Sequence, residues 1–286
     1  MSDPMQPQNS AAPRSTSPRF PAEVVALAEA VLAAGAEIMR IRAEGIRAEA
    51  KADQSPVTAA DLAAEALLRA RLHDILPGVP VIAEEAVSQG RGESPAATFL
   101  LVDPLDGTRE FVAERGEFTV NVGLVEDGVP TLGLIYAPAI GRLFVGSAGG
   151  RFGALGAFTA ERTPGAAADA AGWTRIGCRP RPAEGLVAVA SRSHLDPHTT
   201  ALLGTLPVAE RVSCGSALKF GLVAEGRADV YPRLSPVMEW DVAAGHALLR
   251  AAGGTVTRPD GSPLPYGRSQ EGYRVPGFLA TGPGMD

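Results

Sequence analysis

Apolar and polar residues alternate along the chain with two different periods, which predict helices packed on sheets. Apolar residues recur at helical spacing over Pro21–Ala43 and again over Ala60–Leu76, so each segment predicts an amphipathic helix. Shorter apolar runs at Val79–Ala83 and Phe99–Val102 are hydrophobic on both faces and too brief for free-standing helices. They predict strands buried inside a sheet.

The middle of the chain has the period of antiparallel strands. Alternating segments separated by Gly and Pro predict a meander over Phe118–Val125, Thr131–Ala137, Arg142–Ser147 and Arg151–Ala154. The segment Thr159–Ala171 is rich in Ala, Gly and Pro and has few large apolar residues. We interpret it as a surface connection between two halves of the chain.

The second half returns to alternating strands and helices. The pattern predicts strands at Leu186–Ala190, Val208–Val212, Ala228–Pro232, Thr255–Thr257 and Phe278–Ala280, and helices at Pro197–Gly204, Ala217–Glu225 and Glu239–Ala252. The predicted organisation is therefore an N-terminal α+β half over residues 21–158 and a C-terminal α/β half over residues 172–286. Residues 1–20, rich in Ser, Pro and Gln without an apolar centre, are expected to form a disordered tail rather than a signal peptide.

Composition narrows the class of protein. The 286 residues are 45% hydrophobic and 20% charged, which is typical of a globular chain, and no apolar run approaches the roughly 20 residues that span a bilayer. A net charge of −6 argues against a nucleic-acid polymer as partner, so a nucleotide ligand would be small and held at a defined site. Cys178 and Cys214 are too few for a disulfide framework or a four-cysteine zinc site, and they fit a reducing cytoplasm.

Candidate chemistry begins where the Phe99–Val102 run ends in acidic residues. Asp103 lies at the carboxyl end of the predicted strand, Pro104 is expected to stop ladder pairing, and Asp106 follows in a tight turn. Two carboxylates so close repel each other unless a cation lies between them. Mg²⁺ is the expected cation, because it takes oxygen ligands and is usually held by one or two carboxylates together with substrate phosphate. The alternative is an Asp-rich turn without a ligand.

The residues that follow Asp106 indicate that a phosphate could bind next to the two aspartates. Gly107 and Thr108 precede a predicted helix over Arg109–Arg115, and the free N–H groups at the start of a helix attract anions. The Val79–Ala83 strand also ends on acid, which can bring Glu84 beside the two aspartates if both strands share one sheet. Glu84 could equally be a solvated loop residue.

Other candidates each have a structural explanation when taken alone. Asp241 and Asp61 lie in the first turns of predicted helices, where an aspartate commonly caps the helix. Ser193 and His194 could belong to a polar loop, and Lys219 could be a solvated helical lysine. The joint pattern is more specific than any one of these residues.

That joint pattern resembles the inositol monophosphatase superfamily of Mg²⁺-dependent, lithium-sensitive phosphatases. The resemblance covers nearly the whole chain after the tail and rests on Ser55-Pro56-Val57-Thr58-x-x-Asp61, Glu84-Glu85, Asp103-Pro104-Leu105-Asp106-Gly107-Thr108 and Trp240-Asp241-x-Ala243-Ala244-Gly245. It implies an α/β (α+β) fold, a layered αβαβα sandwich of the inositol monophosphatase/fructose-1,6-bisphosphatase type.

Within the superfamily the chain is similar to the CysQ-type 3′(2′),5′-bisphosphate nucleotidases. This similarity rests on Lys51-x-Asp53-x-Ser55-Pro56-Val57-Thr58, Gly116-Glu117-Phe118-Thr119-Val120-Asn121, Ser191-Arg192-Ser193-His194, Gly215-Ser216-Ala217-Leu218-Lys219-Phe220 and Ala228-Asp229-Val230-Tyr231-Pro232-Arg233. The segment Arg274-Val275-Pro276-Gly277-Phe278 departs from the pattern, since many relatives have Asn before the proline. The C-terminal loop is therefore expected to make different contacts.

The resemblance implies a role for each matching position. Two or three Mg²⁺ ions would bind the carboxylates of Glu84, Asp103, Asp106 and Asp241 and the backbone carbonyl of Leu105, so that Glu84, Leu105, Asp106 and Asp241 also face the substrate. Gly107 and Thr108 would donate backbone N–H groups to phosphate. Asp61 and Thr108 would orient the attacking water, with Glu84 helping to accept its proton. The nucleotide part would be held by Ser193, His194, Gly215 and Lys219.

The implied function is Mg²⁺-dependent hydrolysis of the 3′-phosphate of 3′-phosphoadenosine 5′-phosphate to AMP and phosphate, which removes a by-product of sulfate assimilation. Hydrolysis of inositol 1-phosphate or another sugar phosphate is the alternative. A catalytically silent binding protein is a third reading, although the presence of Asp61, Glu84 and Thr108 together argues against it. The expected location is the cytoplasm. The sequence leaves open peripheral contact with the inner membrane and the choice between monomer and homodimer.

Overall fold

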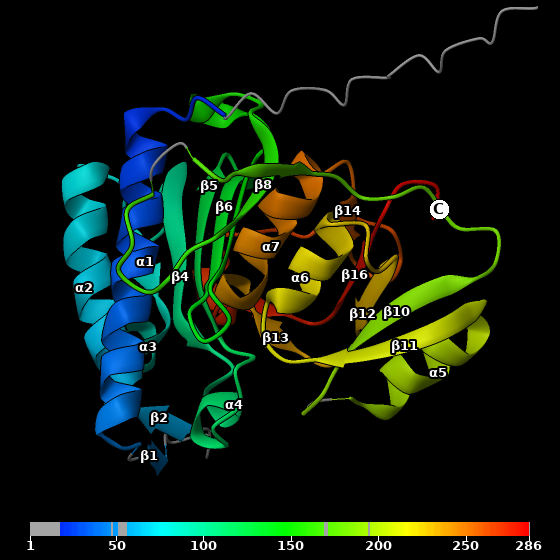
Figure 1. The fold of residues 1–286 in the computed structure, drawn as a ribbon, viewed down its shortest axis with the longest axis horizontal. Helices are drawn as coiled ribbons and strands as arrows, with labels where there is room; N and C mark the ends of the chain where they lie inside the picture. The colour runs from blue at the N-terminus through cyan, green and yellow to red at the C-terminus, as the bar shows by residue number, and fades with distance from the viewer. Residues whose placement is uncertain (1–17, 47, 51–55, 169–170, 194, 286) are drawn as a thin grey trace, which may run out of the picture.

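The computed structural model describes residues 18–46, 48–50, 56–168, 171–193 and 195–285. Most of the predicted tail, Lys51 to Ser55 of the quoted motif, and His194 lie outside these ranges. The described residues form five layers in the order helices, sheet, helices, sheet, helix (Figure 1). This is the predicted αβαβα sandwich. None of the described helices combines the length and apolar composition that crossing a membrane requires.

The helices begin at residues that favour a helix start. Thr58 and Asp61 form a capping box at α2, and Asp196 caps α5, whose first residue is Pro197. The helices are α1 Ala22–Glu44, α2 Ala59–Ile75, α3 Glu84–Ser88, α4 Thr108–Val112, α5 Pro197–Thr205, α6 Leu218–Ala224 and α7 Glu239–Ala251, with short 3₁₀ turns at Gly150–Phe152 and Ser269–Glu271.

The larger sheet has seven strands in chain order. β3 and β4 are parallel, and every later pair is antiparallel. The strands are β3 Val81–Ala83, β4 Thr98–Asp106, β5 Thr119–Glu126, β6 Val129–Ala137, β7 Arg142–Ser147, β8 Gly156–Glu161 and β9 Thr174–Ile176. A separate antiparallel pair joins β1 Ala48–Ala50 to β2 Pro56–Thr58.

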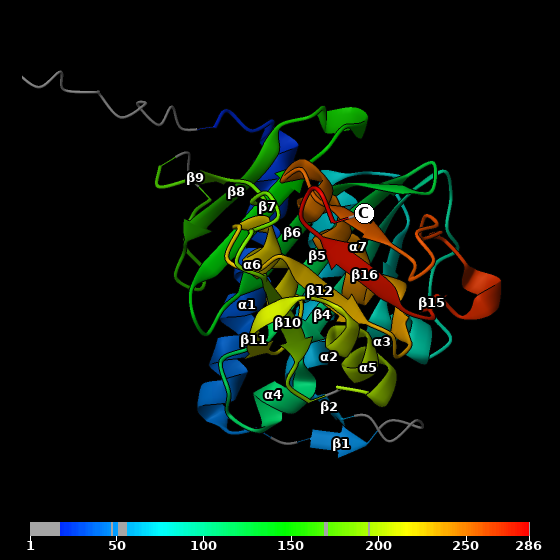
Figure 2. The ribbon, with the colours of Figure 1, turned by 90° about the vertical axis from the view of Figure 1, so that its right-hand side faces the viewer.

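The smaller sheet has the order β11-β10-β12-β16-β14 and faces the viewer in Figure 2. β10 is parallel to β11 and β12, whereas β16 is antiparallel to its neighbours. Its strands are β10 Leu186–Ser191, β11 Val208–Cys214, β12 Val230–Arg233, β14 Thr255–Thr257 and β16 Phe278–Thr281, and a short pair β13 Val237–Met238 and β15 Arg274–Val275 lies beside it.

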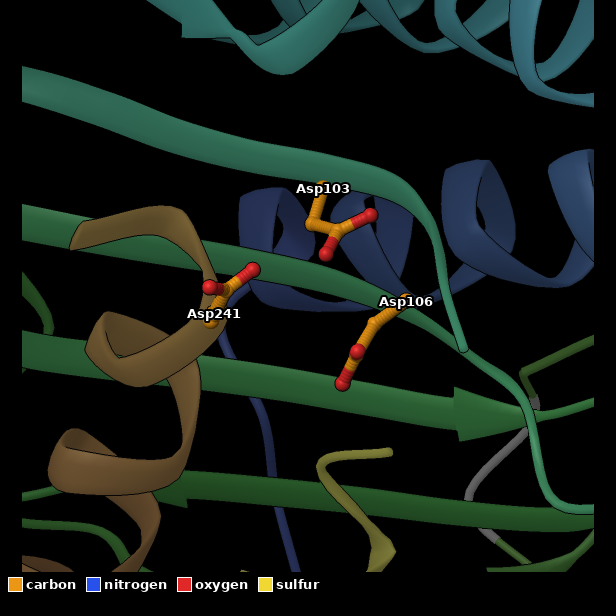
Figure 3. A group of neighbouring side chains, drawn as sticks. All are labelled: Asp103, Asp106 and Asp241. Atoms are coloured by element: carbon orange, nitrogen blue, oxygen red, sulfur yellow. The ribbon is translucent and has the colours of Figure 1, made fainter. Parts of the chain in front are cut away.

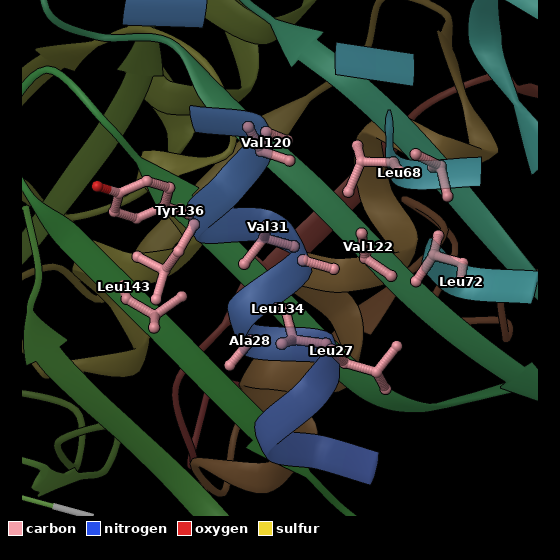
Figure 4. Packing of buried hydrophobic residues seen from close by; sticks show 14 of the residues in the cluster. Leu27, Ala28, Val31, Leu68, Leu72, Val120, Val122, Leu134, Tyr136 and Leu143 are labelled. Atoms are coloured by element: carbon pink, nitrogen blue, oxygen red, sulfur yellow. The ribbon is translucent and has the colours of Figure 1, made fainter. Parts of the chain in front are cut away.

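Helices cover both faces of the larger sheet. α1 and α2 pack on one face, where Leu27 and Val31 of α1 meet Val122 and Leu134 of the sheet in a fully buried cluster (Figure 4). α6 and α7 lie between the two sheets, and α5 covers the outer face of the smaller one. Burying apolar faces on both sides of each sheet is the main stabilising contribution to such a sandwich.

A row of glycines brings α7 unusually close to the larger sheet. Gly123, Gly133 and Gly146 are neighbours across β5, β6 and β7. A Cβ added at Gly133 would lie 2.0 Å from the carbonyl oxygen of Ala244, and one added at Gly146 would lie 2.6 Å from the Cα atom of Leu248. Any side chain in this row would push α7 away from the sheet and from the acidic residues of β4.

The structure corrects the predicted end of the central strand. β4 continues past Asp103 to Asp106, so the prediction that Pro104 stops the ladder is wrong. Asp103 is opposite Asn121 and Asp106 is opposite Thr119, so β4 has two intervening residues where β5 has one. This is a β-bulge, which accommodates the proline without a ladder hydrogen bond and changes the direction of the side chains around it.

Two other predicted elements are shifted. The helix expected over Arg109–Arg115 is the single turn α4, Thr108–Val112, and it stops because Glu114 adopts a positive φ of 58°. The strand expected at Arg151–Ala154 is instead β8, Gly156–Glu161, which follows a 3₁₀ turn.

Candidate metal and phosphate site

Three aspartates from two distant segments of the chain meet between the two sheets. Asp103 and Asp106 flank the β4 bulge, and Asp241 lies in the first turn of α7. Each offers a carboxylate oxygen that lies within 4.8 Å of one from each of the other two. Figure 3 shows the three side chains turned toward a shared space. Carboxylates at this spacing suit a hard divalent cation.

Backbone and side-chain donors orient these carboxylates. The N–H of Leu105 donates to Oδ1 of Asp103 at 3.0 Å, and the N–H of Met238 donates to Oδ2 of Asp241 at 2.7 Å. Asp241 therefore also caps α7, as a helix-start aspartate commonly does. Oδ2 of Asp106 accepts from Nδ2 of Asn121, which lies opposite Asp103 on β5, at 3.4 Å. The acidic side chains are thus held in place before any cation binds.

The electrostatics of the cluster disfavour three bare negative charges. Burial, followed by the charges of Glu84, Asp106 and Asp241, raises the pKa of Asp103 well above its ordinary value. Burial and the charge of Asp241 raise the pKa of Asp106 to about 6, against the opposing effect of Lys219 and other cations. Burial also raises the pKa of Asp241. A cation would replace these protons, so the residues fit a metal site.

Glu84 borders the cluster without being one of the three close carboxylates. It is the first residue of α3, directly after β3, and β3 pairs with β4 so that Ala83 is opposite Val102. This register places Glu84 beside Asp103, whose pKa its charge raises. Both residues line the same cavity.

A threonine and an aspartate form a second group next to the cluster. The hydroxyl of Thr108 lies 3.2 Å from Oδ1 of Asp61 and 3.2 Å from the carbonyl oxygen of Leu105. The N–H and hydroxyl of Thr58 donate to Oδ2 of Asp61 at 2.7 and 2.6 Å. Asp61 is only 2% exposed. Because Thr58 holds Oδ2 of Asp61, Oδ1 is left to face the hydroxyl of Thr108.

One cavity of about 360 Å³ brings these groups together. Its lining includes eight of the predicted site residues: Glu84, Asp103, Leu105, Asp106, Gly107, Thr108, Lys219 and Asp241. Four cationic residues line it, namely Arg109 of α4, Lys219 of α6, Arg233 of β12 and Arg274 of β15. The cavity therefore combines a carboxylate cluster with positive charge, an arrangement suited to a metal and an anion bound side by side.

Three of the described residues predicted for the site, Asp61, Ser193 and Gly215, are absent from the cavity lining. Asp61 lies behind Thr108. The hydroxyl of Ser193 donates to the carboxylate of Glu110, and the N–H of Gly215 donates to Glu117. His194 lies outside the described residues. The nucleotide-binding roles of Ser193, His194 and Gly215 stay predictions.

The cavity also contains residues to which the sequence analysis gave no role. Arg233 ends the quoted Ala228–Arg233 motif, and Arg274 begins the segment that departs from the relatives. A basic residue next to each motif was the available signal. Ala217, which also lines the cavity, carries no such signal, because its side chain is a single methyl group.

Comparison with known proteins agrees with this site. The model of the inositol monophosphatase family matches residues 21–277, and the chain belongs to that family. It is accordingly a phosphatase. A relative from Salmonella typhimurium, named 3′(2′),5′-bisphosphate nucleotidase CysQ, is 39% identical over 236 residues, which cover 81% of this chain and 87% of the relative. The CysQ of Escherichia coli O157:H7 is 38% identical and covers 87% of this chain and 95% of its own length.

Solved structures show the same similarity. CysQ from Bacteroides thetaiotaomicron, described as a bacterial member of the inositol monophosphatase family, superimposes with a TM-score of 0.75 at 36% identity, covering 91% of this chain and 96% of that one. An inositol monophosphatase from Anabaena (Nostoc) gives a TM-score of 0.67 at 30% identity, with 90% and 89% coverage. The resemblance inferred from the motifs is confirmed.

Proposed function

We propose that the protein is a Mg²⁺-dependent phosphatase that hydrolyses 3′-phosphoadenosine 5′-phosphate to AMP and phosphate, removing a by-product of sulfate assimilation. The observation that carries this proposal is the cavity that joins the Asp103, Asp106 and Asp241 cluster to four cationic side chains. The names of the CysQ relatives support the choice of a bisphosphate nucleotide as substrate.

Asp103, Asp106, Asp241 and Glu84 would hold two or three Mg²⁺ ions together with the carbonyl oxygen of Leu105. When bound, Mg²⁺ supplies neutralisation of the phosphate dianion and a lower pKa for a nearby water. The aspartates suit this role because they lie close together, Asp103 is buried and the other two are half-buried, and backbone or side-chain donors orient them.

Backbone N–H groups of Gly107 and Thr108 would bind the phosphate. Gly107 precedes α4 with a φ of 91°, a left-handed conformation that glycine adopts without strain. This turn directs the chain from the β4 bulge into the first turn of α4, where N–H groups lack partners within the helix. The phosphate-binding groups thus lie next to the carboxylates on the same short segment.

The Thr108 and Asp61 pair would orient the attacking water. The Thr108 hydroxyl can donate to Asp61 and accept a hydrogen bond from water with its remaining lone pair. As the water attacks phosphorus, its proton can pass toward this pair or to Glu84, which lines the same cavity. The water oxygen forms the new P–O bond while the bond to the ribose 3′-oxygen breaks, and that oxygen takes up a proton to become the 3′-hydroxyl of AMP.

The cations would bind the rest of the substrate. Lys219 is 1% exposed and its ammonium group donates to the carbonyl oxygens of Cys214 and Ser216 at 3.3 and 2.5 Å. Arg233 lines the same cavity as Asp106 and Asp241. Burial lowers the pKa of its guanidinium, but Tyr231 and the two carboxylates together raise it. A second phosphate at the 5′ position would give these cations a partner that inositol 1-phosphate lacks.

A panel of phosphomonoesters tests the substrate directly. We expect 3′-phosphoadenosine 5′-phosphate to be hydrolysed with a kcat/KM about 10²-fold above that of inositol 1-phosphate, since buried cations left without their anionic partner strongly disfavour the analogue. Phosphate release with Mg²⁺ and Li⁺ varied is the measurement, and 3′-AMP is the control for loss of the 5′-phosphate alone. Preference for inositol 1-phosphate would overturn the nucleotide assignment in favour of the alternative.

Stabilisation by Mg²⁺ should depend on pH. In the metal-free protein the folded pKa of Asp106 is raised to about 6, so its carboxyl favours folding below the unfolded pKa and this contribution is lost as pH rises through 6. Mg²⁺ binds the deprotonated cluster, and we therefore expect it to raise Tm by several degrees at about pH 7.5 and much less at about pH 5. Thermal melting in matched ionic strength, with KCl as control, measures this. Equal shifts at both pH values would contradict a cluster that binds protons and metal competitively.

We also propose that the enzyme works in the cytoplasm. Cys178 and Cys214 are both free thiols, and burial raises the pKa of each, to about 12 for Cys178 and about 11 for Cys214. Buried, protonated thiols of this kind are inert, and unpaired cysteines are typical of proteins in reducing compartments.

A further inference from the structure

Two charged residues without a role in the proposed reaction, Glu117 and Arg192, join two of the sequence motifs in the structure. Glu117 belongs to the Gly116–Asn121 motif and lies between α4 and β5 of the larger sheet. Arg192 belongs to the Ser191–His194 motif and follows β10 of the smaller sheet. Nη2 of Arg192 donates to Oε1 of Glu117 at 2.7 Å, so the contact joins the two layers that form the cavity.

Glu117 also binds the loop after β11. Its Oε2 accepts from the N–H of Gly215 at 2.9 Å, and Arg192 donates from Nη2 to the carbonyl oxygen of Ser213 at 2.9 Å. One carboxylate therefore connects two segments of the smaller sheet's edge. We call Glu117, Arg192 and Gly215 the latch.

The packing at the latch is tight. A Cβ added at Gly215 would lie 2.7 Å from the carbonyl oxygen of Glu117 and 2.9 Å from Cγ of Glu110. Glu110 itself accepts from the hydroxyl of Ser193, one residue after Arg192. The segment that follows the phosphate-binding turn is thus in contact with both loops of the smaller sheet.

The latched loops form part of the cavity wall. Ser191 precedes Arg192, and Ser216 and Ala217 follow Gly215, and all three line the cavity. Ser216 adopts a positive φ of 48°, a conformation that a serine holds only where its surroundings fix it. The loop after β11 is held by two charged groups. The ammonium group of Lys219 donates to the carbonyl oxygens of Cys214 and Ser216, and the carboxylate of Glu117 accepts from the N–H of Gly215.

We propose that Glu117 is a positioning residue: its carboxylate holds the 191–193 and 213–217 segments in the arrangement that binds substrate, without touching the substrate itself. Glu117 is absent from the cavity lining, whereas the segments it holds are part of it. This inference rests on the proposed function of the cavity. It assigns to Glu117 the control of the cavity's affinity for the part of the substrate that does not react.

A weakened latch should act on affinity rather than on chemistry. If the 191–193 and 213–217 segments adopt the binding arrangement for only a fraction of the time, the apparent Kd for the substrate rises by the inverse of that fraction. Once substrate is bound the wall is again in place, so kcat changes little. A merely structural role would lower Tm or the amount of active enzyme and leave KM unchanged.

Glu117→Gln tests the latch with almost no change of shape. The amide offers one acceptor where the carboxylate offered two, so it cannot satisfy both Gly215 and Arg192. We expect KM for 3′-phosphoadenosine 5′-phosphate to rise about tenfold with kcat within about twofold of the parent. Amide hydrogen exchange of peptides covering 191–193 and 213–217 should become faster. Glu114→Gln, the same change on an exposed side chain in the same segment, is the matched control.

A double-mutant cycle separates the latch from unrelated effects. Arg192→Gln removes the guanidinium contacts with Glu117 and with Ser213. We expect the double variant to raise KM by less than the product of the two separate effects, because both changes break one unit. An unchanged KM and unchanged exchange in Glu117→Gln would overturn the proposal. If the parent does not hydrolyse the nucleotide, the proposed function fails first. The same KM comparison, made with whichever phosphomonoester the parent hydrolyses best, then still decides the role of Glu117.

Discussion

Replacing Asp103 by Asn is expected to reduce Mg²⁺-dependent kcat/KM by at least about 10³-fold while the protein stays folded. Asp103 is 1% exposed and lies with Asp106 and Asp241 inside the cluster, so the change removes a charged oxygen ligand at its centre. The amide oxygen of Asn can still accept the N–H of Leu105, which preserves the local turn. Phosphate release at saturating Mg²⁺ measures the loss.

Stability distinguishes this result from simple unfolding. Burial and neighbouring acids raise the pKa of Asp103, so ionisation of its carboxyl opposes folding of the metal-free protein. Tm of metal-free Asp103→Asn should therefore equal or exceed that of the parent. Asp127→Asn, the same change at an exposed hairpin turn, should leave turnover unaltered. Parental turnover in Asp103→Asn would remove the metal-site argument.

Replacing Thr108 by Val is expected to lower kcat by about 10²-fold with little change in the Mg²⁺ concentration needed for half-maximal rate. Valine has nearly the same shape as threonine but lacks the hydroxyl that joins Asp61 to the cavity. The attacking water would lose its orienting partner, whereas the acidic cluster would remain intact. Steady-state rates over a Mg²⁺ series separate these two quantities.

Thr108→Ser is the matched control, because it restores the hydroxyl without the methyl group. We expect serine to recover most of the rate. If kcat fell equally in Thr108→Val and Thr108→Ser, the loss of hydroxyl function would not explain the result, and the altered packing of the side chain would. A parental rate in Thr108→Val would exclude a part for the Thr108 and Asp61 pair in water activation.

The layered fold could be predicted because its signals are local. Apolar residues at helical spacing mark the buried face of α1 and of α2, and continuous apolar runs mark β3 and β4 as strands buried on both faces. The spacing of apolar residues along the chain is enough to predict these elements. The β4 bulge could not be predicted, since Pro104 reads as a strand end and only the pairing of Asp103 with Asn121 and Asp106 with Thr119 shows that the ladder resumes.

The acidic residues of the candidate site could be predicted from the sequence, because metal binding depends on the type of side chain. Asp103 and Asp106 stand out at a strand end, but the approach of Asp241 depends on the glycine row beneath α7, whose members are far apart in sequence. The contacts of Ser193 and Gly215 with Glu110 and Glu117 join two halves of the chain, and no local pattern encodes such a contact.

Magnesium titration calorimetry on the metal-free parent and on Asp103→Asn tests the central claim most directly. At about pH 7.5 we expect saturable Mg²⁺ binding to the parent, accompanied by proton release, because the bound metal displaces protons from acids of raised pKa. The variant should lose at least one binding event. Equal binding of Mg²⁺ by both proteins, or no saturable binding by the parent, would contradict a magnesium site built on Asp103, Asp106 and Asp241.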